Sequence, residues 1–340
     1  MTTFPERSAT AVASDARMPG FFIVGHAKCG TTALYEMLRR HPQIYMPSLD
    51  GAASKEPQYF SRDNPNPQTS DVRSVAYTGR REMTLEEYLS LFTQAREGQR
   101  IGEASTSYIW STCAADRIAQ ARPDARIIAI MREPASYLRS LHLQMLVNHA
   151  EVEKDLRVAV ALDQPRREGR RIPAHHYWPQ FLIYSDRVRY VEQLRRYRAV
   201  FPREQVLVLI YDDFRADNEA TLRRVLRFLD VDERADIQMR DANPSSTVRS
   251  MRLNELRRTL SSGRGPLPRA LRTTGKALTS SRFRNAIFYP VQRRLMYASP
   301  PPPDEEFMTL LRRRFKAEVE ALSDYLQRDL VTLWGYDRLG

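Results

Sequence analysis

Short apolar runs followed by helical segments are the feature that most constrains the fold of this 340-residue chain. Three such runs are typical of strands buried on both faces, because they are short and lack polar alternation. They occupy residues 21–24, 125–131 and 206–210. Helical segments follow them at residues 31–40, 135–148 and 218–229. This order predicts an α/β fold in three layers, with helices flanking a central parallel sheet.

The remaining segments predict one elaborated domain. We expect further elements as a helix at 84–95, a strand at 100–105, a helix at 185–200 and a long final helix at 305–330. Residues 151–174 and 243–284 are Arg-rich and irregular by composition. Because neither an internal repeat nor an interdomain linker is visible, we expect a single domain over residues 20–340. The polar residues 1–19 before it are expected to form a disordered tail.

Composition excludes several classes of protein. With 42% hydrophobic and 28% charged residues, the chain is typical of a globular protein. The two cysteines, Cys29 and Cys113, make neither a disulfide framework nor a metal site. The first twenty residues lack the apolar core of a signal peptide, and no run of eighteen apolar residues occurs. We therefore expect a cytoplasmic protein without a transmembrane segment.

The strongest local motif is the loop GHAKCGTT, residues 25–32, between a predicted strand and a helix. Glycines let such a loop turn tightly, and the helix N-terminus after it attracts an anion. Gly25 and Gly30 have the spacing of a P-loop, but Thr31 stands where a P-loop has its lysine and Lys28 lies inside the loop. This order argues against an ordinary magnesium NTPase. The alternative is a plain strand–turn–helix connection.

A second basic motif follows the strand at 125–131. P-loop enzymes usually place a metal-binding Asp after such a strand, whereas this chain has Arg132, Glu133 and Pro134, with Ser140 eight residues after Arg132. A guanidinium suits an anionic group rather than a cation. Arg132 and Ser140 could share one phosphate; alternatively Arg132 pairs with Glu133 or another carboxylate, and Ser140 faces a neighbouring helix. A nucleotide with phosphates at both ends satisfies both motifs.

These motifs resemble those of the family of sulfotransferases that use 3′-phosphoadenosine 5′-phosphosulfate (PAPS). GHAKCGTTAL at 25–34 is similar to the family's 5′-phosphosulfate loop, and MREPASYLRS at 131–140 to its 3′-phosphate motif. Weaker similarities are VLVLIYDDF at 206–214, FLDV at 228–231 and LWGYD at 333–337. The resemblance extends over nearly the whole chain from Phe21. It implies a P-loop-like fold and direct, metal-free transfer of a sulfuryl group from PAPS to an oxygen or nitrogen.

The resemblance also implies roles for individual residues. Lys28 would stabilise the leaving group by binding the bridging oxygen of the phosphosulfate. Arg132 and Ser140 would bind the 3′-phosphate. The 5′-phosphate would be held by backbone groups and hydroxyls of four residues, namely Cys29, Gly30, Thr31 and Thr32. Such roles agree with a reaction that depends on positioning and charge stabilisation.

The candidate base is Glu56. Lys55-Glu56-Pro57-Gln58-Tyr59-Phe60 resembles the KEPxFF element of sulfotransferases of the heparan-sulfate and carbohydrate type, in which the glutamate removes the acceptor's proton. The alternative is an exposed Glu56 paired with Lys55. Sulfotransferases of small phenols use a histidine, but no histidine here lies in a matching motif. His26 lies in the loop, where filling space is the favoured role.

The sequence leaves two roles open for each of two further residues, Arg249 and Glu103. Animal members of the family have a Gly- and Lys-rich loop that covers the nucleotide, and this chain has no evident counterpart. The segment 243–249 could take its place, with Arg249 on the 3′-phosphate. The alternative is that Arg249 is a solvated arginine in a basic loop. Glu103 could border the acceptor site or serve the end of a strand.

The basic character, a formal charge of +12, leaves other classes to consider. One is a P-loop small-molecule kinase, against which Lys28 and Arg132 both argue. Another is a nucleic-acid or membrane-binding protein, which no recognised motif supports. The acceptor is expected to be a small molecule, a carbohydrate or a glycolipid. The basic segments 151–171 and 249–284 could bind an acidic acceptor.

Overall fold

The computed structural model describes residues 18–47, 55–61, 83–148, 150–173, 179–235, 237, 247–248, 297–298 and 300–339. The chain divides into two compact units, each of which is described by itself. The first comprises Met1–Tyr137, Asp186–Asn243 and Arg312–Gly340. The second comprises Leu138–Ser185 and Pro244–Leu311. The single domain over 20–340 stays a prediction, and residues 1–17 of the expected tail lie outside the described residues.

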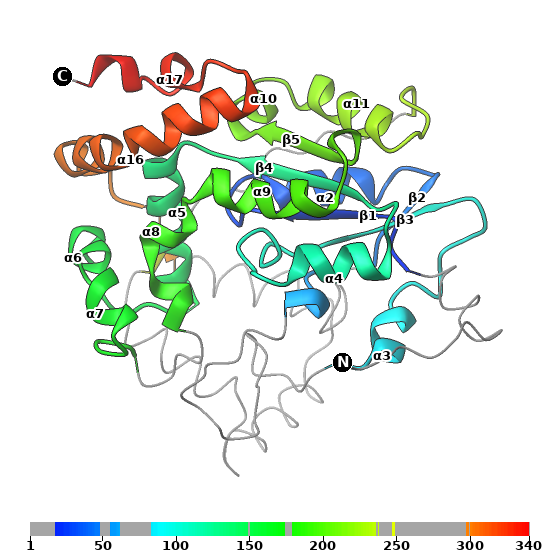
Figure 1. Ribbon diagram of the computed structural model, residues 1–340, viewed down its shortest axis with the longest axis horizontal. Coiled ribbons are helices and arrows are strands. Elements are labelled where there is room, and N and C mark those ends of the chain that lie inside the picture. The colour runs from blue at the N-terminus through cyan, green and yellow to red at the C-terminus, as the bar shows by residue number, and fades with distance from the viewer. Residues whose placement is uncertain are drawn as a thin grey trace, which may run out of the picture. The chain divides into compact units, whose positions relative to one another are not determined.

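A five-stranded parallel sheet forms the centre of the first unit and confirms the α/β fold (Figure 1). Its strands lie in the order β2-β3-β1-β4-β5, and each neighbouring pair is parallel. They are β1 (Phe21–Gly25), β2 (Ile44–Tyr45), β3 (Arg100–Ala104), β4 (Arg126–Met131) and β5 (Val206–Ile210). All five residues of β1 are buried, as the absence of polar alternation predicts for a central strand.

Helices cover both faces of this sheet. The chain passes from β1 to β2 in one direction across the sheet, and from β3 to β4 and on to β5 in the other. Right-handed crossovers therefore put α2 (Thr31–Leu38) on one face, and α4 (Ala114–Ala121) and α9 (Tyr190–Val200) on the opposite face. The contact between α4 and α9 agrees with this assignment (Figure 1).

The remaining elements of the first unit lie around this layered core. Three helices of the first unit are α3 (Leu85–Ser90), α10 (Tyr211–Ala216) and α11 (Asn218–Phe228). The last helices are α16 (Glu305–Leu326), whose first seven residues belong to the second unit, and α17 (Leu330–Leu333). A capping box starts α3, in which the Thr84 hydroxyl and the Glu87 carboxylate each bond the other residue's backbone N–H.

Several boundaries differ from the sequence predictions. The helix expected at 185–200 is two helices, α8 (Tyr184–Arg187) and α9, because residues 188–189 leave the helical path. The final helix ends at Leu326 rather than 330, and Gln327 has a positive φ of 52°. Strand β2 and helix α4 were not predicted; β2 has only two residues, too few for a period to be recognised.

The second unit includes part of the Arg-rich segment that the composition predicts to be irregular. That prediction is wrong for the described part of 151–174, since α6 (Leu156–Ala161) and α7 (Asp163–Arg167) form there. Helix α5 (Pro134–Val147) continues into this unit, and a two-stranded antiparallel pair joins β6 (Thr247–Val248) to β7 (Tyr297–Ala298). Arg166 is buried and forms a bidentate ion pair with Glu151, with N–O distances of 2.8 and 2.9 Å.

Candidate active site

The loop between β1 and α2 has the shape of an anion cradle. The His26 N–H donates to Ile130 O at 3.1 Å, and the Cys29 N–H donates to His26 O at 3.3 Å, which closes a tight turn. Lys28 and Gly30 have positive φ angles of 64° and 87°. Gly30 occupies the N-cap position of α2 and has no side chain to cap the first-turn N–H groups. Those groups and the helix dipole therefore favour an anion at this place.

Glycine is required at position 30 for two reasons. Its φ of 87° is left-handed, and a Cβ added there would lie 2.8 Å from ring atoms of Phe214. An L-residue would therefore strain the backbone and displace the ring. The sequence motif identified this glycine, but its packing against α10 is visible only in the fold.

Arg132 and Lys28 come together because β4 lies beside β1, so that both following loops are at the carboxyl edge of the sheet. Arg132 Nη1 donates to the Lys28 carbonyl at 2.9 Å, and its guanidinium carbon lies 4.6 Å from the centre of the Tyr211 ring. Burial lowers the pKa of the Lys28 ammonium, and the positive charge of Arg132 lowers it further. Two like charges that act on each other in this way favour an anionic ligand beside them.

Glu133 does not form the ion pair with Arg132 that the sequence left open as one alternative. Its carboxylate accepts from the backbone N–H groups of Ala135 and Ser136 and so caps the start of α5. The Tyr336 hydroxyl donates to the same carboxylate at 2.6 Å. Arg132 therefore keeps guanidinium donors for a ligand, while Glu133 fixes the helix that follows.

Two loop residues are deeply buried. His26 is fully buried beside the Tyr137 and Tyr190 rings, and burial lowers its pKa to about 3. Burial also raises the pKa of the Cys29 thiol to about 12, so that thiol stays protonated and unreactive. The loop-filling role of His26 is confirmed. The Cys29 N–H is bonded within the loop, and its predicted role at the 5′-phosphate stays a prediction.

Glu56 lies near the N-terminus of α2, to which Lys55 connects it. Its Oε1 accepts from Lys55 Nζ at 3.3 Å, and its Oε2 accepts from the Thr106 hydroxyl at 3.0 Å. Lys55 Nζ also donates to Thr32 Oγ1 at 2.8 Å, so it connects the candidate base to the first turn of α2. The Glu56 side chain is 31% exposed, which leaves its carboxylate accessible. The sequence motifs predict no separate role for Lys55 or Thr106; the KEP element is the only sequence signal at Lys55.

Other predicted residues have mixed outcomes. Thr31 is buried at the start of α2. Ser140 is 3% exposed on α5 in the second unit, so its juxtaposition with Arg132 stays a prediction. Arg249 lies outside the described residues. Glu103 is 1% exposed and accepts hydrogen bonds from two tyrosine hydroxyls, those of Tyr88 and Tyr108, as expected of a structural carboxylate.

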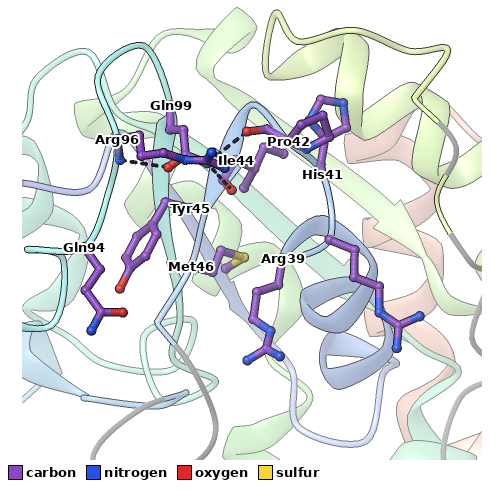
Figure 2. A pocket seen from close by; sticks show the side chains of 10 residues that line it. Arg39, His41, Pro42, Ile44, Tyr45, Met46, Gln94, Arg96 and Gln99 are labelled. Carbon is purple, nitrogen blue, oxygen red and sulfur yellow. Dashed lines mark hydrogen bonds between the residues drawn. The ribbon is translucent and has the colours of Figure 1, made fainter.

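A separate pocket of about 360 Å³ lies at the opposite edge of the sheet (Figure 2). It is bounded by the C-terminal end of α2 and the start of β2, with Arg39, Tyr45 and Gln94 among its lining residues. Tyr45 pairs with Ile101, the second residue of β3, so the pocket lies at the edge of the sheet where the strands begin. It is therefore distinct from the loop at residues 25–32, which lies at the carboxyl edge.

Comparisons with known proteins agree with this geometry. A family model described as the sulfotransferase family matches residues 19–236, more than half of the chain. The chain belongs to the sulfotransferase family. The matched range contains Lys28, Glu56, Arg132 and Ser140. The protein is therefore an enzyme of the transferase class.

Individual relatives are more distant. Human carbohydrate sulfotransferase 15 is 24% identical over 280 residues, which cover 68% of this chain and 47% of the relative. Human heparan sulfate glucosamine 3-O-sulfotransferase 6 is 32% identical over 130 residues, covering 38% and 31%. The chain thus spans about half the length, or less, of these curated relatives. A solved sulfotransferase from Alicyclobacillus acidocaldarius has 25% identity and a TM-score of 0.63, covering 93% of this chain and 98% of that one.

Two further features of the described residues bear on the site. None of the helices there has the length and apolarity needed to cross a membrane. The same part of the chain contains no cluster of three or more His, Cys, Asp or Glu side chains that could hold a metal ion.

Proposed function

We propose that this sulfotransferase moves a sulfuryl group from PAPS to a hydroxyl or amine of a carbohydrate or other small acceptor. The observation that carries the proposal is the bond from Arg132 to the Lys28 carbonyl, which joins two cationic loops at the carboxyl edge of the sheet. A magnesium-dependent kinase needs a carboxylate after the strand that ends at Met131, and the chain has Arg132 there. The kinase alternative therefore has less support, and no recognised motif supports nucleic-acid binding.

The residues of the loop fit a phosphosulfate. Backbone N–H groups at the N-terminus of α2 and the hydroxyls of Thr31 and Thr32 would bind the 5′-phosphate. Lys28 would hold the bridging oxygen and stabilise the negative charge that develops there when the S–O bond breaks. Arg132, with Ser140 and Arg249 as further expected contacts, would bind the 3′-phosphate. When bound, PAPS supplies the activated sulfuryl group; the chain supplies position and charge.

Glu56 is the proposed base. Its carboxylate would accept the proton of the acceptor hydroxyl as the acceptor oxygen bonds to sulfur and the bridging oxygen leaves on PAP, the 3′,5′-bisphosphate product. Both of its oxygens already accept a hydrogen bond, which fixes the orientation of the group. The reaction needs no metal in this scheme.

The acceptor class is proposed from the relatives. The names of the curated relatives specify carbohydrate and heparan sulfate glucosamine sulfation. We extend this to a carbohydrate or glycolipid hydroxyl for this chain, in agreement with its KEP element. The cytoplasm remains the proposed location.

Thermal melting of the purified protein with PAP, with AMP, and with ATP and magnesium tests the proposal. A ligand at a hundred times its Kd adds about 2.7 kcal/mol, which raises the melting temperature by several degrees. We expect a shift with PAP and little with AMP, because only PAP carries a 3′-phosphate. A shift with magnesium ATP alone would contradict the proposal and favour a kinase.

Two variants sharpen this test. Lys28→Ala should abolish transfer of radiolabelled sulfate from PAPS. Arg132→Ala should chiefly weaken PAP binding, since a lost charged hydrogen bond of about 1.5–3 kcal/mol corresponds to roughly ten- to a hundredfold in affinity. Unchanged PAP affinity in Arg132→Ala would remove this arginine from the 3′-phosphate site.

A further inference from the structure

Lys55 lies between the phosphosulfate loop and the candidate base. Its Nζ donates to Thr32 Oγ1 at 2.8 Å and to Glu56 Oε1 at 3.3 Å. The Lys55 side chain is only 12% exposed, and its Nζ lies 6.0 Å from the centre of the Tyr35 ring. A solvated lysine on a surface loop has neither this burial nor two separate acceptors, so Lys55 is more than an exposed partner of Glu56.

The contact with Thr32 determines how that hydroxyl can be used. A hydroxyl has one hydrogen to donate and lone pairs that accept, whereas an ammonium only donates. Thr32 Oγ1 must therefore accept from Lys55, and it keeps its own hydrogen for a different acceptor. Thr32 is the second residue of α2, within the turn whose N–H groups favour an anion. The Thr32 hydroxyl is thus left to donate to that anion.

The contact with Glu56 acts on the other side of the site. Lys55 donates to one carboxylate oxygen and Thr106 donates to the other, so the group is held at both oxygens. A general base must present its oxygen in a defined direction to the acceptor hydroxyl, and hydrogen bonds to both oxygens fix that direction. One ammonium therefore orders a threonine at the helix terminus and a carboxylate beside it.

We propose that Lys55 is a positioning residue for sulfuryl transfer, which directs the Thr32 hydroxyl toward the phosphosulfate and holds Glu56 ready as the base. The inference rests on the proposed function, because both groups through which Lys55 acts are assigned there. The inference gives a role to a second lysine besides Lys28. Neither the P-loop-like motif nor the role of Glu56 as the base requires this lysine.

Lys55→Met tests the proposal, because methionine keeps much of the aliphatic stem and removes the charge and the donors. PAP affinity and transfer of radiolabelled sulfate to a panel of desulfated glycosaminoglycans and simple phenols would be measured. We expect kcat to fall roughly tenfold or more and PAP affinity to fall several-fold. The loss should appear in kcat more than in the KM for the acceptor, because Lys55 acts on the Thr32 hydroxyl and the Glu56 carboxylate.

A double-mutant cycle with Thr32→Val separates positioning from a general loss of structure. If Lys55 acts on PAP through the Thr32 hydroxyl, Lys55→Met will weaken PAP binding in the parent protein but not in Thr32→Val. Lys316→Met is the matched control, since it removes the same charge from a half-buried lysine on α16 and should leave every quantity unchanged. Lys55→Arg keeps a charged donor, so it should recover much of the kcat that Lys55→Met loses, and it tests the role even where Lys55→Met folds poorly.

The outcomes distinguish this inference from the function on which it rests. If the parent protein binds PAP and transfers sulfate, but Lys55→Met keeps its kcat, the positioning role is wrong and the proposed function stands. Additive effects in the cycle would likewise overturn the link to Thr32. If the parent protein neither binds PAP nor transfers sulfate, the proposed function fails and the inference fails with it.

Discussion

His26 illustrates how burial, rather than residue type, decides which side chains of the loop can react. Gln193 Nε2 donates to the carbonyl oxygens of Asp186 and Arg187, so the Gln193 Oε1 is the atom that accepts from His26. His26 Nε2 therefore carries the hydrogen, and Nδ1 accepts from the Tyr137 hydroxyl at 3.2 Å. Both nitrogens of a neutral imidazole are thus engaged, which leaves none for catalysis.

This neutral, buried imidazole predicts a loss of stability in acid. The pKa of His26 is about 3 in the folded protein against 6.5 for the ordinary side chain. Only the unfolded chain binds a proton between these values, so the free energy of unfolding falls as pH drops from about 6.5 toward 3. The slope approaches ~1.4 kcal/mol per pH unit. Urea unfolding at pH 7.5, 6 and 4.5 would measure it.

His26→Gln is the control for that slope, because glutamine offers polar atoms without an imidazole. We expect the variant to be less stable than the parent at pH 7.5 and to lose less stability on acidification. Parallel curves for the two proteins would show that His26 does not carry the effect.

Among the secondary elements, prediction succeeded where a pattern is local. The strands β1, β4 and β5 are runs of apolar residues, and the loop motif lies directly between β1 and α2, so both could be recognised without the fold. The contact between Lys55 and Thr32 could not, because 23 positions separate the two residues and only the folded chain brings them together. The stacking of Arg132 on Tyr211 is tertiary for the same reason.

Gly30→Ala tests whether the loop conformation positions the start of α2. The new Cβ would meet the Phe214 ring at 2.8 Å, and the φ of 87° would be strained. We expect a loss of roughly 2–4 kcal/mol in the free energy of unfolding, from backbone strain and overpacking together. PAP binding should weaken at the same time, because α2 must shift. Urea unfolding and PAP titration would measure both.

Gly98→Ala provides the matched control, since Gly98 has a φ of 78° but no atom within 4 Å of an added Cβ. It should cost only the backbone strain of about 1–2 kcal/mol and leave PAP binding unchanged. Equal effects of the two substitutions would mean that contact with Phe214 does not position the helix.

At the scale of the whole molecule, the 53 Lys and Arg side chains are not all available to ligands, because ion pairs already engage some of them. The Arg-rich segment 151–171 was predicted as a possible surface for an acidic acceptor. Within it, Arg157 pairs with Asp304, Arg170 pairs with Glu168, and Arg166 is buried against Glu151. Composition counts charges but cannot say which of them are already paired, because pairing depends on the tertiary structure.

The Glu151–Arg166 pair should therefore stabilise the second unit rather than bind an acceptor. The side chains are 0% and 1% exposed, and Tyr184 also donates to Glu151. Glu151→Gln leaves a buried arginine without its counter-charge, which typically costs about 3–5 kcal/mol. The exposed pair of Glu219 and Arg223 on α11 is the control, and Glu219→Gln should cost less than about 1 kcal/mol.

Replacing both buried partners distinguishes a need for charge from a need for filled space. In Glu151→Leu with Arg166→Met no buried charge remains uncompensated, so urea unfolding should show most of the lost stability restored. If the double variant is instead as unstable as Glu151→Gln, the hydrogen bonds from Arg166 to the carbonyls of Ala159 and Leu182 hold the unit together. In either case Arg166 acts inside the fold, and an acidic acceptor would have to be bound by other residues.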